Sequence, residues 1–161
     1  ADSDAIVLRD SQTDPIAPED WFSVLGRHEF FLCPPGASQP MCHNAVEAMA
    51  AGMIPILEYG DRFNPQLIDG KNAICFSGRS GLIDAIERID AMSVEARGVL
   101  RRNVCSYFDN HLRGESFLSR IEMGASIEKI DRISMPFHNK DLYVDDGRGL
   151  GPGWSPSRQA A

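Results

Sequence analysis

Short apolar runs alternate with helical patterns along this chain. Three continuous apolar runs, at residues 30–33, 53–57 and 73–76, are typical of strands that are buried on both faces. A shorter run, Ile6 to Leu8, could form a further strand. The pattern therefore predicts short, mostly buried strands separated by other elements.

Two helices are expected in the first third of the chain. Pro18-Glu19-Asp20 is typical of a helix start, with Pro in the first turn and acids near the positive end of the dipole, and Gly26 closes that helix. From about His43 the apolar residues fall at helical spacing, and Gly52 is placed to end the helix.

The link between the second and third apolar runs is expected to be irregular. Residues 59–64 are predicted as loop, Pro65 to Ile68 as a short helical turn, and Asp69-Gly70 as a tight turn.

Two longer helices are predicted next. Ser80 could cap the first, and its expected buried stripe is Leu82, Ile83, Ile86 and Ile89. The second is expected to begin at Ser93 and to bury the following residues: Val99 or Leu100, Val104, Phe108, and His111 or Leu112. Residues 115–133 continue the helical pattern.

The order strand, helix, strand, turn, strand, helix predicts an α/β, Rossmann-like fold, in which helices flank a parallel sheet. We expect one domain over residues 1–135 and an extended or disordered tail over residues 136–161, where Gly, Pro and Ser dominate.

Composition narrows the class of function. The 161 residues are 43% hydrophobic, and 16 Lys and Arg against 23 Asp and Glu give a formal charge of −7. This is the composition of a globular domain, and its acidic balance argues against nucleic acid or an anionic membrane as a partner. No apolar run approaches the roughly 20 residues of a transmembrane helix, and no signal peptide is visible. We therefore expect a cytoplasmic protein.

The cysteines and histidines do not predict a metal site. The four cysteines, Cys33, Cys42, Cys75 and Cys105, lack the close spacing of zinc or redox motifs and are expected to be reduced, with Cys33 and Cys75 in buried strands. Cys42 and His43 could suggest a nucleophile and its base, but adjacent residues do not naturally face each other.

The stretch from Pro34 to Pro55 points to a binding site. A buried strand breaks there into a loop of small residues that opens a helix, an arrangement that binds anions. Gly36, Ala37 and Ser38 would let a diphosphate approach the backbone, and Glu47, about one turn into the helix, could accept hydrogen bonds from two ribose hydroxyls. The alternative for Glu47 is a solvated carboxylate that the helix dipole favours.

These residues resemble a known family. Glu47-Ala48-Met49-Ala50-Ala51-Gly52-Met53-Ile54-Pro55 is similar to the Glu-Ala-Met-Ala-x-Gly-x-Pro string of GT-B fold glycosyltransferases, particularly glycosyl transferases group 1, with the proline shifted by one position. Exostosin-like enzymes have a similar strand, loop and Glu-bearing helix. The resemblance covers residues 29–112 and implies the C-terminal, donor-binding half of the GT-B fold.

The resemblance also implies roles for single residues. Glu47 matches the acid that binds the ribose of the nucleotide sugar, and the backbone at His43 and Asn44 would meet the diphosphate. The family's first acid, which lies near the transferred sugar in the catalytic centre, falls on Gln39, which brings no negative charge.

We therefore expect metal-independent glycosyl transfer from a nucleotide-diphosphate sugar, with no further cofactor. The acceptor-binding domain would lie outside this chain. Before Glu47, only Arg9 and Arg27 are Arg or Lys, whereas the family supplies further strands and basic groups there. The alternative expectation is a noncatalytic binding or interaction module derived from such a domain.

Overall fold

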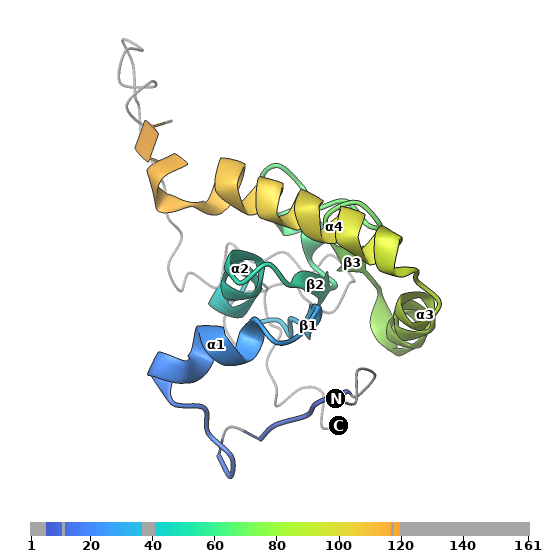
Figure 1. The fold of residues 1–161 in the computed structure, drawn as a ribbon. Coiled ribbons are helices and arrows are strands. Elements are labelled where there is room, and N and C mark those ends of the chain that lie inside the picture. The colour runs from blue at the N-terminus through green and yellow to red at the C-terminus, as the bar shows by residue number, and fades with distance from the viewer. Residues whose placement is uncertain (1–5, 11, 37–40, 117, 120–161) are drawn as a thin grey trace, which may run out of the picture.

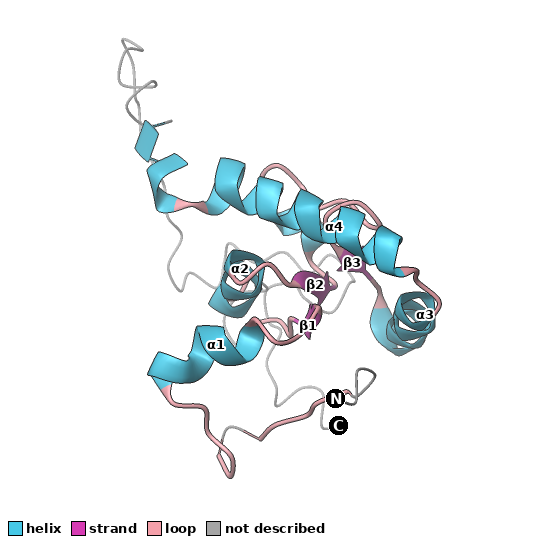
Figure 2. Ribbon diagram, in the orientation of Figure 1, coloured by secondary structure: helices cyan, strands magenta, loops and turns pink. Residues whose placement is uncertain are grey.

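A small parallel sheet lies at the centre of a mixed α/β fold (Figure 2). The computed structural model describes residues 6–10, 12–36, 41–116 and 118–119. Its three strands follow one another in chain order: β1 (Phe30–Leu32), β2 (Ile54–Leu57) and β3 (Ile74–Cys75). The predicted α/β class and the three main strands are thereby confirmed.

The α-helices with both ends in the described residues are α1 (Trp21–Leu25), α2 (His43–Ala50), α3 (Gly78–Asp90) and α4 (Val94–Tyr107). The helix α2 connects β1 to its parallel neighbour β2, whereas an irregular link joins β2 to β3. In Figure 1, α4 passes over α2 and the sheet, and it contacts both α2 and β2. Within the described ranges, no helix combines the length and the apolar character needed to span a lipid bilayer.

The boundaries of α2 and α4 follow from local chemistry. The helix α2 ends before Gly52, whose φ of 75° lies in the left-handed region that glycine adopts without strain. At the start of α4, the Ser93 hydroxyl accepts a hydrogen bond from the backbone N–H of Ala96 at 3.2 Å. Both boundaries confirm the predictions from sequence.

The core lies between the sheet, α2 and α4. All four residues of β2 are buried, and α4 contributes the buried side chains Leu100, Val104 and Tyr107. The edge strand is less enclosed than predicted, because Leu32 of β1 is 44% exposed. The side chains that are almost completely enclosed include the following: Tyr59, Met49, Met53, Ile54, Leu57, Ile74, Val104, Pro55 and Cys33.

The strand considered for Ile6 to Leu8 is not formed. These residues have no strand assignment, and their side chains are 74%, 54% and 88% exposed. An apolar triplet becomes a strand only when a partner offers it backbone hydrogen bonds, and the described part of the chain provides none at this position.

The short helical turn predicted at Pro65 to Ile68 is also wrong. A 3₁₀ turn forms instead at Gly60–Arg62, inside the predicted loop. The carbonyl of Gly60 accepts the backbone N–H of Leu67, so a contact between separate parts of the link decides where the turn lies. The tight turn at Asp69-Gly70 is confirmed, with a φ of 70° at Gly70.

The predicted buried stripe of α3 is partly wrong. Ala85 is the residue of α3 that is buried, whereas Ile83 and Ile86 are 49% and 40% exposed. Leu82 and Ile89 pack at the margin of the core. Ser80 does not cap the helix either, because α3 begins at Gly78, whose backbone N–H donates to the Glu58 carboxylate at 2.6 Å. The remaining helical pattern to residue 133 and the tail at 136–161 fall outside the described residues.

Two glycine substitutions are expected to change the free energy of unfolding in opposite directions. We expect Gly52→Ala to lower the free energy of unfolding by about 1–2 kcal/mol, because an alanine at φ 75° is strained. Gly98→Ala, inside α4, should raise it by about 0.5–1 kcal/mol because alanine is the better helix former. Urea denaturation of both variants measures the two effects, and a stabilised Gly52→Ala would contradict the left-handed turn.

Candidate functional site

The candidate site lies where β1 leads through a loop into α2. Because α2 connects two parallel strands, its N-terminus lies at the carboxyl edge of the sheet. Gly36, in the first part of this loop, is partly buried. Ala37, Ser38 and Gln39 lie outside the described residues, so their roles stay predictions.

The first turn of α2 has no side-chain cap among the described residues. Its N-cap, Cys42, is extended, and within residues 41–50 its side chain makes no capping hydrogen bond to the amides of this turn. The first N–H groups of a helix have no partner within the helix. Asn44 lies in this turn, and its buried Oδ1 has no hydrogen-bond partner in the described part of the chain. His43 is exposed beside it.

Glu47 lies one turn further along α2 and is already engaged. Its Oε2 accepts a hydrogen bond from the indole Nε1–H of Trp21 at 2.8 Å. Trp21 is the first residue of α1, so this bond joins two helices across 26 residues of sequence. For the other oxygen, Oε1, the described residues supply no partner.

Tyr59 connects the two ends of the same loop. The residue is fully enclosed, and its hydroxyl donates to the carbonyl of Pro34 at 3.4 Å. Burial raises the pKa of Tyr59, the nearby Cys33 and Cys42 add to the increase, and a hydrogen bond from the backbone N–H of Cys42 opposes it. The phenol therefore stays protonated and contacts the loop where it begins and where it ends.

The side chains of Cys42 and His43 contact each other, which was not expected for adjacent residues. The Cys42 sulfur is 3.6 Å from Nδ1 of the His43 ring. A nucleophilic site would also need a group that orients the histidine, and no hydrogen bond from a third side chain to His43 is found among the described residues. In the same ranges, no group of His, Cys, Asp or Glu side chains is arranged to hold a metal ion.

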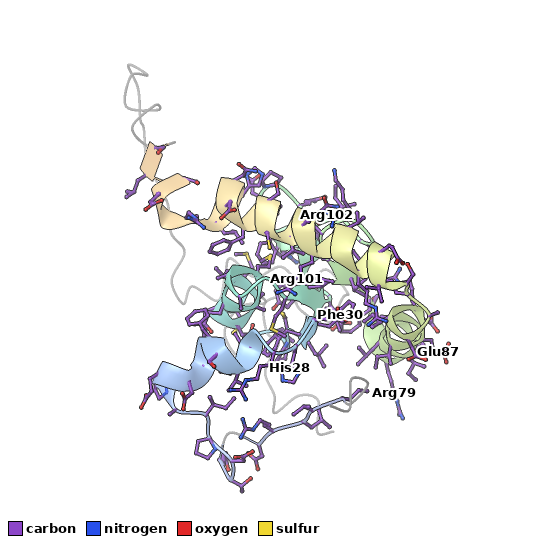
Figure 3. All side chains as sticks on the ribbon, in the orientation of Figure 1. His28, Phe30, Arg79, Glu87, Arg101 and Arg102 are labelled. Carbon is purple, nitrogen blue, oxygen red and sulfur yellow. The ribbon has the colours of Figure 1, made fainter. Side chains whose placement is uncertain are left out.

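Arg101 lies at the C-terminal end of α2, opposite to the candidate site. Arg101 of α4 lies beside the Gly52 turn that follows α2. In Figure 3, Arg102 extends from the opposite side of α4. Because an α-helix rises about 1.5 Å per residue, Arg101 is roughly the length of α2 away from the uncapped N-terminus. An anion at that N-terminus would therefore depend on backbone N–H groups rather than on Arg101.

The chain matches no family model, no curated protein and no solved structure. Two residues of the site, Trp21 and Tyr59, were not singled out from the sequence. A partly buried indole needs an acceptor for its N–H, and this general rule was the one available signal for Trp21.

The reactivity of the cysteines tests whether Cys33 is buried. All four are free, and Cys33 is 2% exposed. Burial raises the pKa of the Cys33 thiol to about 12. At pH 8 an ordinary thiol with a pKa of about 8.5 is partly ionised. We therefore expect alkylation of Cys33 by iodoacetamide to be at least about a thousandfold slower than that of such a thiol.

Peptide mass spectrometry measures this protection, with Cys42 as the internal comparison because it is partly exposed. Labelling in 8 M urea is the control for reagent access. Equal labelling of Cys33 and Cys42 in the folded chain would contradict the burial of the first.

Proposed function

We propose that this chain is the Rossmann-like, donor-binding half of a GT-B glycosyltransferase, and that it binds a nucleotide-diphosphate sugar. The observation that carries the proposal is the placement of Glu47. Its carboxylate lies about one turn from the uncapped N-terminus of α2, with Oε1 unengaged by the described residues. An anion site and an acceptor of two hydroxyls are thus combined on one helix.

The parts of the donor would be recognised separately. The diphosphate would lie at the start of α2, near His43 and Asn44, where the helix dipole and free N–H groups favour negative charge. The ribose hydroxyls would donate to Glu47, and Gln39 would lie near the sugar. In this proposal backbone N–H groups stabilise the departing diphosphate instead of a divalent cation. The acceptor would be held by a separate domain.

Calorimetric titration of the chain with UDP, GDP and ADP tests this proposal. We expect saturable binding of one of them, unchanged by EDTA. Glu47→Ala should weaken that binding about tenfold, because it removes a hydrogen bond to a charged group. Glu87→Ala is the matched control, since this exposed carboxylate lies on α3 (Figure 3) and its loss changes the net charge equally.

Binding that requires Mg²⁺ or Mn²⁺ would overturn the metal-independent part of the proposal. An equal loss in Glu47→Ala and Glu87→Ala would remove the assigned role of Glu47. Absence of binding to any of the nucleotides by a folded sample would reject the donor site in this chain.

A noncatalytic module is the second candidate, and the Trp21–Glu47 hydrogen bond favours it. That bond gives Glu47 a structural function, the attachment of α1 to α2, which needs no ligand. In a module of this kind, Glu47→Ala would lower the free energy of unfolding by about 1–3 kcal/mol and nucleotides would not bind. The titration and a denaturation curve of the same variant distinguish the two candidates.

A further inference from the structure

The hydrogen bond between Trp21 and Glu47 joins two side chains that each belong to a helix. Glu47 belongs to α2, and Trp21 opens α1 immediately after the 3₁₀ turn Pro18–Asp20. The Trp21 ring packs edge-on against Phe31 of β1, with ring centroids 6.2 Å apart and planes at 90°. The direction of the indole N–H is therefore fixed by packing against the sheet.

This contact makes the two carboxylate oxygens of Glu47 different. Oε2 accepts from the indole at 2.8 Å, whereas Oε1 has no partner among the described residues. The terminal torsion of a glutamate side chain is broad and weakly restrained on its own. The hydrogen bond to this packed ring restricts that torsion and so fixes the direction in which Oε1 accepts.

We infer that Trp21 is a positioning residue that makes the site selective for ribonucleotides over 2′-deoxyribonucleotides. This inference rests on the proposed function. A ribose offers two neighbouring hydroxyls as donors, and a carboxylate held in one orientation receives both without first losing rotational freedom. A 2′-deoxyribose offers one hydroxyl, so it gains less from this orientation.

The test compares two probes on the unmodified chain and on two variants. The probes are the nucleoside diphosphate that the unmodified chain binds, chosen from UDP, GDP and ADP, and its 2′-deoxy counterpart. Trp21→Phe keeps an aromatic ring against Phe31 but removes the N–H donor. Phe22→Ala is the matched control, because it alters the next residue of α1, which is 54% exposed.

We expect Trp21→Phe to weaken the ribonucleotide about fivefold to tenfold, the equivalent of one hydrogen bond, and the deoxynucleotide less than about twofold. The preference for ribose then falls in Trp21→Phe and is retained in Phe22→Ala. An equal loss for both probes, or no loss, overturns the positioning role and leaves the donor site standing. If the unmodified chain binds neither probe, the proposed function fails and this inference fails with it.

A spectroscopic measurement covers the case in which Trp21→Phe does not fold. The chain has two tryptophans, Trp21 and Trp154, so Trp154→Phe leaves one indole N–H resonance in the NMR spectrum. We expect Glu47→Gln to shift that resonance in the free chain, and the ribonucleotide to shift it more than the deoxynucleotide does. Equal shifts with the two probes would overturn the inference.

Discussion

Leu57→Ala is expected to lower the free energy of unfolding by about 2–5 kcal/mol, because it opens a cavity at the centre of the sheet. Leu57 is 0% exposed. It ends β2, the strand that pairs with both other strands, and lies opposite Cys75 of β3. A loss of this size is a large fraction of the 5–15 kcal/mol that stabilises a typical domain. Urea denaturation measures this loss, and an unchanged m-value would show that the surface exposed on unfolding is the same in both chains.

Ile83→Ala is the matched control for that variant. It also shortens a branched aliphatic side chain, but Ile83 is 49% exposed on α3. We expect a change within about 0.5 kcal/mol. A loss comparable to that of Leu57→Ala would mean that the exposed face of α3 is covered in solution.

Tyr59→Ala is expected to have the second large effect, a loss of about 3–5 kcal/mol. Tyr59 is 0% exposed, and its ring stacks on Phe63 with centroids 6.4 Å apart. Truncation removes this packing together with the hydroxyl that contacts the carbonyl of Pro34. Thermal and urea unfolding followed by circular dichroism measure the loss.

Tyr59→Phe separates the hydroxyl from the ring. The ring stays, so we expect a loss of about 1 kcal/mol for the hydrogen bond. We also expect weaker nucleotide binding, because the two ends of the loop before α2 are no longer joined through the hydroxyl. Unchanged nucleotide affinity in this variant would show that Tyr59 supports the core alone.

The parts of the fold that depend on local chemistry could be predicted from the sequence. The apolar runs at residues 30–33, 53–57 and 73–76 became β1, β2 and β3, and the hydroxyl of Ser93 caps α4 as expected. These features can be recognised in a short stretch of chain, because a continuous apolar run and a capping serine are local sequence signals.

Features that depend on a distant partner were predicted less well. The helical spacing of α3 indicates an apolar face, but the width of the covered part depends on how far the sheet and α4 reach, and Ile83 and Ile86 lie beyond it. The run at Ile6 to Leu8 has strand composition without a strand beside it.

The candidate site also combines features that follow from the local sequence with features that depend on distant residues. The uncapped start of α2 and the position of Glu47 one turn inside it follow from the local pattern. The Trp21–Glu47 bond joins residues far apart in the sequence, and no periodicity encodes that distance. The hydroxyl of Tyr59 meets Pro34 through the parallel pairing of β1 and β2.

The strand order places β1 and β3 at the two edges of the described sheet. Because β1, β2 and β3 lie side by side in chain order, β1 and β3 each have a strand neighbour on one side only within the described residues. An unpaired edge presents N–H and C=O groups to which another strand can bind. On the outer side of β3, however, the backbone N–H of Cys75 already donates to Asp69 Oδ1 at 2.8 Å. A further strand could therefore be added beside β1, while β2 and the start of α2 keep their positions. A larger sheet would therefore be compatible with the same geometry at the candidate binding site.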